Sequence, residues 1–190
     1  MIVSYDNSLL LQKMPLDHKA FIGLSNLNRS FDLTSMRLFC SNNSILDLGC
    51  HYGITSFDAL QNGAKKVVAI DSDPECIKIA KQILGEDKSS VIEHDLTIPS
   101  SLKYLGFSKG EFNTVFYLAI HQHLAHRKPG SEENMLNEII DLNPEYIIFR
   151  AKGFTEKISK TLTEKFGKMC FYAHLDRRLG PMIAYENRNK

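Results

Sequence analysis

From Ser44 onward, short apolar runs alternate with longer segments that are apolar along one side only. Several runs are nearly continuous in Val, Ile, Leu and Phe, as is typical of strands buried on both faces of a parallel sheet. We predict strands at residues 44–49, 66–71, 90–95, 113–120 and 145–151. Their alternation with helical segments predicts an α/β fold with a doubly wound, mostly parallel sheet.

The segments between these runs carry signals for the ends of helices. A helix within 55–63 is expected to end at Gly63, because glycine readily adopts the left-handed conformation that closes a helix. Asp73 and Pro74 predict the start of the next helix, with the aspartate as its cap and the proline in its first turn, and Gly85 predicts its end. Further helices are predicted over 131–142 and 155–166.

The last part of the chain has a different pattern. Two stretches, 168–176 and 182–188, flank the turn sequence RRLGP, which predicts an antiparallel hairpin at the edge of the sheet. Seven strands are therefore expected, with helices on both faces. Residues 1–43 are expected to form a lid or cap, with a helix over 31–40, and residues 44–190 the main part of one globular domain.

Length and composition agree with a single domain. The chain has 190 residues, enough to bury a core without cross-links. Its 23 Lys and Arg balance 22 Asp and Glu, so charge offers no general attraction to nucleic acid but leaves RNA and DNA open as substrates. No CxxC pair, apolar membrane span or secretory signal is apparent. We expect a cytoplasmic protein with reduced cysteines.

Three aspartates mark the ends of successive predicted strands. Asp47 precedes the glycine-rich turn of ILDLGCHYG, Asp71 ends the second strand and Asp95 the third. The carboxyl ends of parallel strands share one edge of the sheet, where such folds bind their ligands. Asp71 follows the turn by about twenty residues, the placement of a carboxylate that grips ribose hydroxyls. Asp47 would repel a dinucleotide's phosphates, so its charge favours a cationic ligand.

These motifs resemble those of the class I S-adenosylmethionine-dependent methyltransferases. Asp47, Gly49 and Gly53 fit the first motif of that family, although His51 stands where a middle glycine is common. Asp71 fits the second motif and Asp95 the acid beside the adenine ring. The segment FNTVFYLAIHQHL resembles the fourth strand and its exit, with Asn113 and Gln122 in place of an acid and a histidine.

The resemblance implies a cofactor site for S-adenosylmethionine, with S-adenosylhomocysteine as product, in a methyltransferase domain at 44–190. Asp47 would help to hold the ammonium group of the cofactor, Asp71 the ribose, and the Leu96 N–H the adenine ring. The implied cofactor-binding residues are Asp47, Gly49, Cys50, Gly53, Asp71, Ser72, Asp95, Leu96 and Leu118. Arg29 is a further candidate, as a partner of the cofactor's carboxylate.

The sequence HQHLAHR concentrates histidines in what we predict to be a loop, between His121 and Ser131. A histidine titrates near neutral pH and can take a proton from a substrate hydroxyl. His123 is the first candidate for the catalytic base or the group that orients the substrate, and His121 the second. A metal site at these histidines has no parallel in the family's motifs, so we expect none.

The substrate class is less well determined. The HQHL exit resembles methyltransferases of small molecules and sugars, so a small-molecule or glycan substrate is the first expectation. An RNA- or protein-modifying enzyme is the alternative, and a basic channel of Lys103, Arg127, Lys128 and Arg150 would favour it. The third possibility is a non-catalytic partner subunit that retains the cofactor site. The sequence does not indicate an oligomeric state.

Overall fold

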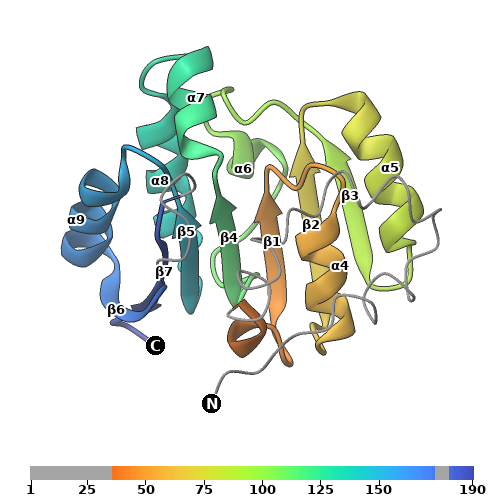
Figure 1. Cartoon of the computed structure of the whole chain (residues 1–190), viewed down its shortest axis with the longest axis horizontal. Coiled ribbons are helices and arrows are strands. Elements are labelled where there is room, and N and C mark those ends of the chain that lie inside the picture. The colour runs from red at the N-terminus through yellow and green to blue at the C-terminus, as the bar shows by residue number, and fades with distance from the viewer. Residues whose placement is uncertain (1–35, 174–179) are drawn as a thin grey trace.

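The computed structural model describes residues 36–173 and 180–190. Its centre is one sheet of seven strands, in the order β3-β2-β1-β4-β5-β7-β6 (Figure 1). The first five run parallel, and β7 is antiparallel to both β5 and β6. The strands are β1 (Ser44–Leu48), β2 (Lys66–Asp71), β3 (Ser89–Glu93), β4 (Thr114–Leu118), β5 (Tyr146–Arg150), β6 (Gly167–Ala173) and β7 (Met182–Asn187). The predicted fold class and all seven predicted strands are confirmed.

Most helices also lie where the pattern predicts them. They are η1 (Arg37–Phe39), α4 (Ile54–Gln61), α5 (Pro74–Leu84), α6 (Ser101–Tyr104), α7 (His121–Arg127), α8 (Ser131–Asp141) and α9 (Thr155–Lys165). Asp73 caps α5, because its carboxylate accepts hydrogen bonds from the N–H groups of Glu75 and Cys76. No described helix has the length and apolar character needed to cross a membrane.

One expectation about the helices needs correction. The segment 121–127, predicted to be a loop, forms α7, and the short helix α6 was not predicted. Of the helix predicted over 31–40, residues 31–35 lie outside the described residues, Met36 is helical, and Arg37–Phe39 form the 3₁₀ turn η1. This turn is tied to α4, since Arg37 donates two hydrogen bonds to the buried carboxylate of Asp58.

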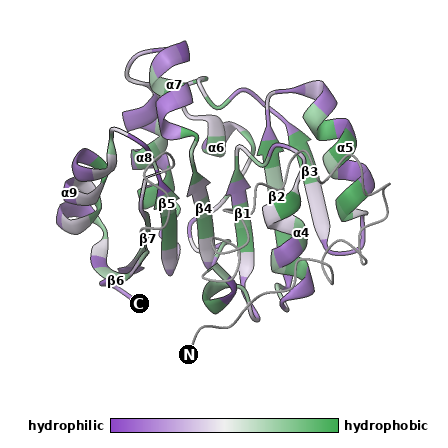
Figure 2. Cartoon of the chain, in the orientation of Figure 1, coloured by the Kyte–Doolittle hydropathy of each residue, from purple (hydrophilic) through white to green (hydrophobic). Residues whose placement is uncertain are grey.

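The core has two layers, one on each face of the sheet. Alternate residues of each strand point to opposite faces, so Leu46 and Leu48 join one cluster and Ile45 the other. Ile139 of α8 and Ile158 of α9 complete the first cluster, while Ala59 of α4 belongs to the second. Apolar residues accordingly dominate the central strands, whereas the helices carry polar residues outward (Figure 2).

The strand order fixes where a ligand can bind. The chain builds β1, β2 and β3 outward in one direction, then returns to place β4 and β5 on the other side of β1. The loops leaving β1 and β4 therefore diverge, and a crevice opens between them at the carboxyl ends of the strands. In Figure 1 this is the upper edge of the sheet, below α7.

Candidate active site

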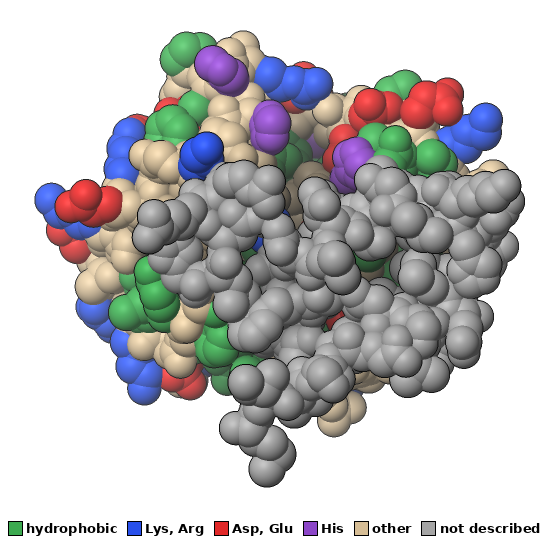
Figure 3. Space-filling model, in the orientation of Figure 1, with side chains coloured by type: hydrophobic (Ala, Val, Ile, Leu, Met, Phe, Trp, Pro, Cys, Tyr) green, Lys and Arg blue, Asp and Glu red, His purple; other side chains and the backbone are tan. Residues whose placement is uncertain are grey.

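A cavity of about 410 Å³ lies at the carboxyl ends of β1 to β4. That volume is within the roughly 300–1,000 Å³ typical of small-molecule sites. The loops after these strands line it together with α7, through Gly49, His51, Asp71, Ser72, Asp73, Cys76, His94, Asp95, Leu96, Leu118, Ala119, Ile120, His123, Leu124 and Arg127. Figure 3 shows histidine side chains along the upper edge of the molecule, where these loops meet.

The β1–α4 turn brings its backbone close to the opposite wall of the cavity. Gly49 has a φ of +74°, and a Cβ there would lie 2.5 Å from Cδ1 of Ile120. The N–H groups of Gly49 and Cys50 both donate to the carbonyl of Ile70, which binds the turn to the end of β2. Gly53, also left-handed, starts α4. Of the three turn residues predicted to bind the cofactor, Gly49 lines the cavity, whereas Cys50 and Gly53 shape the turn behind it.

Asp47 lies beneath this turn rather than in the cavity lining. Only 3% of the residue is exposed, and its carboxylate accepts a 2.7 Å hydrogen bond from the Ser56 hydroxyl of α4. Burial raises the pKa of Asp47 to about 6, and the nearby charge of Asp71 contributes in the same direction. Asp47 thus lies below the turn, where its carboxylate is held by Ser56 of α4.

Asp71 holds together the two loops that border the cavity. One carboxylate oxygen accepts the N–H of His51 at 2.9 Å, and the other accepts the N–H of Asp73 at 3.0 Å. The side chain thus joins the β1–α4 turn to the start of α5 while lining the cavity beside Ser72. Each carboxylate oxygen can accept more than one hydrogen bond, so acceptor capacity is left for a ligand hydroxyl.

Asp95 lies two residues beyond the end of β3, not at its last residue as predicted. Its carboxylate accepts the N–H of Thr97 at 2.9 Å. That hydrogen bond, with the positive charge of Arg127 adding to it, lowers the pKa of Asp95, so the side chain stays ionised. Leu96 and Leu118, the remaining predicted cofactor residues, line the same cavity.

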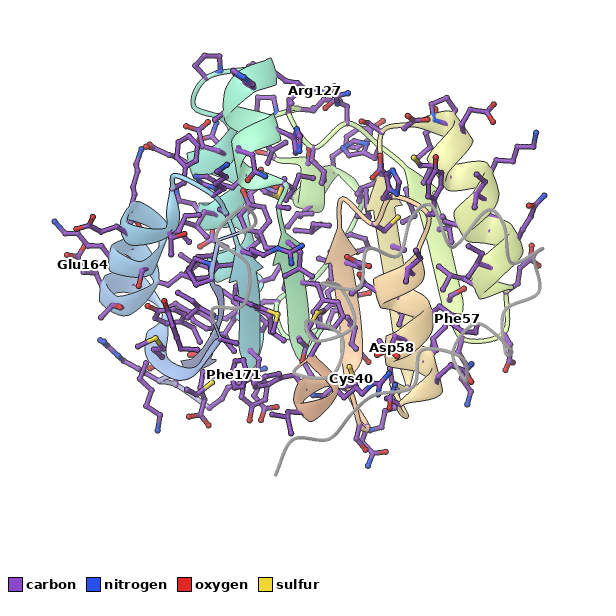
Figure 4. The ribbon with its side chains drawn as sticks, viewed as in Figure 1. Cys40, Phe57, Asp58, Arg127, Glu164 and Phe171 are labelled. Atoms are coloured by element: carbon purple, nitrogen blue, oxygen red, sulfur yellow. The ribbon has the colours of Figure 1, made fainter. Side chains whose placement is uncertain are left out.

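Arg127 connects the two sides of the cavity. Its guanidinium, carried by α7, donates a 2.8 Å hydrogen bond to the hydroxyl of Ser72, just after β2. Figure 4 labels Arg127 at the upper edge of the molecule, extending from α7 toward that loop. The contact bridges the cavity between a helix and a loop that are far apart in sequence.

The two candidate catalytic histidines lie in different places. His123 is exposed and lines the cavity. His121 is only 1% exposed, its Nδ1 lies 2.9 Å from the hydroxyl of Tyr117, and it borders a second, smaller cavity between α8 and α9. Burial lowers the pKa of His121 to about 4, so the ring is neutral near pH 7. Of the two predicted candidates, only His123 lines the main cavity.

Some sequence-based expectations fall outside the described residues. These are Arg29, the lid over the first 30 residues, and the turn residues Arg177 and Arg178. Of the four residues whose basic channel would favour a macromolecular substrate, Arg150 is only 7% exposed in β5. Within residues 36–173 and 180–190, no group of three or more His, Cys, Asp and Glu is arranged to hold a metal ion.

Several residues of the cavity were not predicted from the sequence as part of this site, notably His94, Ile120, Leu124 and Arg127. Three of them belong to the α7 region. Together with His123 they follow the spacing i, i+3, i+4, i+7, which is the signature of one helical face. That spacing was the available signal, and predicting a loop at this segment concealed it. His94 directly precedes Asp95 but carries no comparable signal.

The chain is similar to known methyltransferases in both sequence pattern and fold. A family model described as a methyltransferase domain matches residues 45–142, just over half of the chain. No curated protein matches the sequence.

Solved structures match over most of the chain. Magnesium protoporphyrin IX methyltransferase from Synechocystis PCC 6803, solved with bound S-adenosylmethionine, has 16% identity and a TM-score of 0.65, covering 85% of this chain and 80% of that one. Ribosomal protein L11 methylase from Lactobacillus delbrueckii subsp. bulgaricus has 19% identity and a TM-score of 0.59, and the match covers 84% of this chain and 79% of that one. A structure from Listeria monocytogenes, provisionally assigned as an S-adenosylmethionine-dependent methyltransferase, has 15% identity and a TM-score of 0.67. The match covers 85% of this chain and 99% of that one. At these identities the likeness shows the shared fold.

Proposed function

Because the chain belongs to the methyltransferase domain family, we propose that it transfers the methyl group of S-adenosylmethionine to an oxygen or nitrogen of a small molecule or sugar. The family and the fold make it an S-adenosylmethionine-dependent methyltransferase. The proposal adds the class of substrate and the residues that act on cofactor and substrate.

The observation that carries the proposal is the set of acids around the cavity. Asp71 and Asp95 line it, and Asp47 lies directly beneath its floor turn. Negative charge at this edge suits a cofactor that carries a sulfonium and an ammonium group, and it disfavours the pyrophosphate of a dinucleotide. The close backbone approach at Gly49 suits a ligand that lies against the turn.

Each part of the cofactor has a candidate partner in this arrangement. We assign the ribose hydroxyls to Asp71, with Ser72 next to it, and the adenine side to Asp95 and Leu96. The methionine part would lie along Gly49, with Asp47 acting through the turn above it. Leu118, at the end of β4, would pack against the cofactor from the other side.

The bound cofactor would supply a methyl group already activated by the positive sulfur. The protein's main contribution is then to hold the acceptor atom in line with that methyl group, which can lower the barrier by several kcal/mol. His123 is the exposed titratable group in the cavity on the β4 side. We assign it to orient the acceptor and, for a hydroxyl acceptor, to remove its proton.

Two features favour a small substrate over RNA or protein. The net charge is +1, and Arg150 is buried where an exposed basic channel would need it. Macromolecular substrates remain the alternative, as does a partner subunit that binds the cofactor without turnover.

Calorimetry with S-adenosylhomocysteine tests the cofactor assignment. We expect saturable 1:1 binding by the wild-type protein, and binding at least tenfold weaker in the Asp71→Ala variant, because the ribose loses a charged hydrogen-bond acceptor. Binding of NAD in place of S-adenosylhomocysteine, or an unchanged affinity in the variant, would contradict the assignment.

Labelled S-adenosylmethionine supplied with a cell extract tests the substrate class. Label in the small-molecule fraction supports the proposal. Label in a fraction sensitive to ribonuclease or protease would replace it with the macromolecular alternative. Tight cofactor binding without any label in extracts prepared from several growth conditions would favour a partner subunit.

A further inference from the structure

A second cavity of about 150 Å³ lies between α8 and α9, away from the proposed methyl-transfer site. Its walls come from successive turns of the two helices: Glu133, Leu136 and Asn137 of α8, and Lys157, Ile158, Thr161 and Lys165 of α9. His121, at the start of α7, completes it. The spacing on each helix places these side chains on one face, so the cavity is built from two facing helix surfaces.

The buried imidazole of His121 lacks one hydrogen-bond partner. Nδ1 of His121 lies 2.9 Å from the Tyr117 hydroxyl. Among the described residues, this nitrogen is the only hydrogen-bond partner of that hydroxyl. Nε2, on the opposite edge of the ring, is buried and has no hydrogen-bond partner among the described residues. The ring of Phe154 packs at 5.2 Å and limits its rotation. A buried polar atom without a partner is costly, and it indicates a missing ligand or water.

The hydrogen-bond pattern shows what kind of group is missing. If the Tyr117 hydroxyl donates to Nδ1, as a buried O–H with one available acceptor must, Nε2 carries the hydrogen and is a donor. Lys165 donates a 3.1 Å hydrogen bond to the side-chain oxygen Oδ1 of Asn137, which leaves the side-chain NH₂ group of Asn137 as a donor. Lys157 adds an ammonium group that also pairs with Glu133. Donors therefore dominate the lining, where two ammonium groups face the carboxylate of Glu133. The largely buried carboxylate of Glu132 also lies close enough to act on His121 and Lys157.

From this arrangement we propose that the cavity between α8 and α9 binds a small oxyanion of phosphate type, held by Lys157, Lys165, Asn137 and the Nε2–H of His121. The cavity is of a size for one such group. The hydroxyl of Thr161 already donates to the carbonyl of Lys157, so toward the cavity it can only accept. A protonated phosphate oxygen could donate to Thr161 or Glu133, whereas sulfate has no proton to give. Phosphate is therefore preferred over sulfate.

The full chain, titrated with inorganic phosphate at constant ionic strength, tests this proposal. The imidazole nitrogen signals of His121 in NMR spectra report the contact directly. We expect a saturable change at Nε2, and a weaker response to sulfate. Phosphate and glycerol phosphate serve as two arms: tighter binding of the ester indicates that the natural ligand is a phosphorylated molecule, and binding of phosphate alone indicates the free ion.

Two variants of α9 with the same change of charge make the test specific. Lys165→Gln removes a cavity ammonium group, whereas Lys160→Gln removes an exposed one that does not line the cavity. We expect phosphate affinity to fall about ten- to a hundredfold in the first variant, as for loss of a charged hydrogen bond, and to stay unchanged in the second. No saturation in the wild-type protein, or equal losses in both variants, would overturn the proposal.

Discussion

The carboxylate of Asp47 is buried beneath the turn that borders the active site, with the Ser56 hydroxyl as its hydrogen-bond partner. Its pKa is raised to about 6, above the value near 3.9 of an unfolded chain. The folded state therefore keeps this proton to a higher pH than the unfolded state does. As the pH rises from about 4 to about 6, ionisation of Asp47 removes stability.

We predict that Asp47→Asn stabilises the ligand-free protein at pH 7.5 by about 1–3 kcal/mol, since two units of pKa correspond to roughly 3 kcal/mol. The difference from wild type should shrink toward zero below about pH 4, where Asp47 is protonated in both the folded and the unfolded state. Urea unfolding at several pH values measures it. A gain that does not depend on pH would show that the charge of Asp47 is not its cause.

His123 is the residue to which the proposed chemistry assigns a proton. In His123→Ala we expect kcat to fall about 10²–10⁴-fold, the usual contribution of a general base. The affinity for S-adenosylhomocysteine should stay the same, because the assigned cofactor contacts lie elsewhere. His126→Ala is the matched control, since His126 is exposed on the same helix but does not line the cavity. Unchanged turnover in His123→Ala would remove the assignment.

Two connecting segments, the β1–α4 turn and the link from β4 to α7, pack against each other at Gly49 and Ile120. Gly49→Ala would place a methyl group 2.5 Å from Ile120 Cδ1 at a φ of +74°. We expect a loss of stability of about 1–3 kcal/mol in unfolding measurements, together with weaker cofactor binding as Ile120 is displaced.

Controls separate the two causes of that loss. Gly106→Ala has a similar φ, +80°, with nothing within 4 Å of the added methyl group, so it measures backbone strain alone. Ile120→Val removes Cδ1, and combining it with Gly49→Ala should recover the steric part of the loss. If Gly106→Ala costs as much as Gly49→Ala, the proximity of the two segments has no energetic consequence.

Helix α7 and the loop after β2 are joined by the hydrogen bond from Arg127 to Ser72. We predict that Arg127→Ala weakens S-adenosylhomocysteine binding about three- to thirtyfold, because the guanidinium also lies near the charge of Asp95 at the adenosine end. Calorimetry measures the change. Lys128→Ala, the adjacent exposed cation outside the cavity lining, should have no effect; an equal effect would point to net charge instead.

Across the whole molecule, cofactor binding should appear as stability. At a concentration of S-adenosylhomocysteine about 100 times its Kd, linkage adds about 2.7 kcal/mol. For a chain of this size that corresponds to a rise in Tm of roughly 5–10 °C. A thermal melt with and without S-adenosylhomocysteine checks the rise, with NAD as the control ligand. No rise at saturation would contradict specific binding to the folded state.

The sheet was predictable from the sequence because its strands are continuous apolar runs with clear ends. Helix α7 was not, because HQHLAHR is mostly polar and is followed by proline and glycine, and its one-sided face becomes apparent only when Ile120 is included. For the site, the sequence predicts which strand ends carry acids. It does not show that Asp47, which shares the sheet face of Ile45, points toward α4 instead of into the crevice.

Contacts between distant segments were beyond sequence reasoning for a different reason. The bridge from Arg127 to Ser72 and the pairing of His121 with Tyr117 depend on how α7 packs against the sheet. Periodicity gives the face of a helix but not its neighbour. The pKa of His121 likewise follows from burial, which the polar character of its segment conceals.

The position of β7 between β5 and β6 affects the order in which the sheet can assemble. Strand β6 pairs only with β7 in the described sheet, yet it leaves the ribosome first. Without β7, strand β6 has no partner, and its backbone N–H and C=O groups are free to pair with another chain. A chain that ends before Met182 should therefore expose β5 and β6 to edge-to-edge association, whereas one that ends after Asn187 should not.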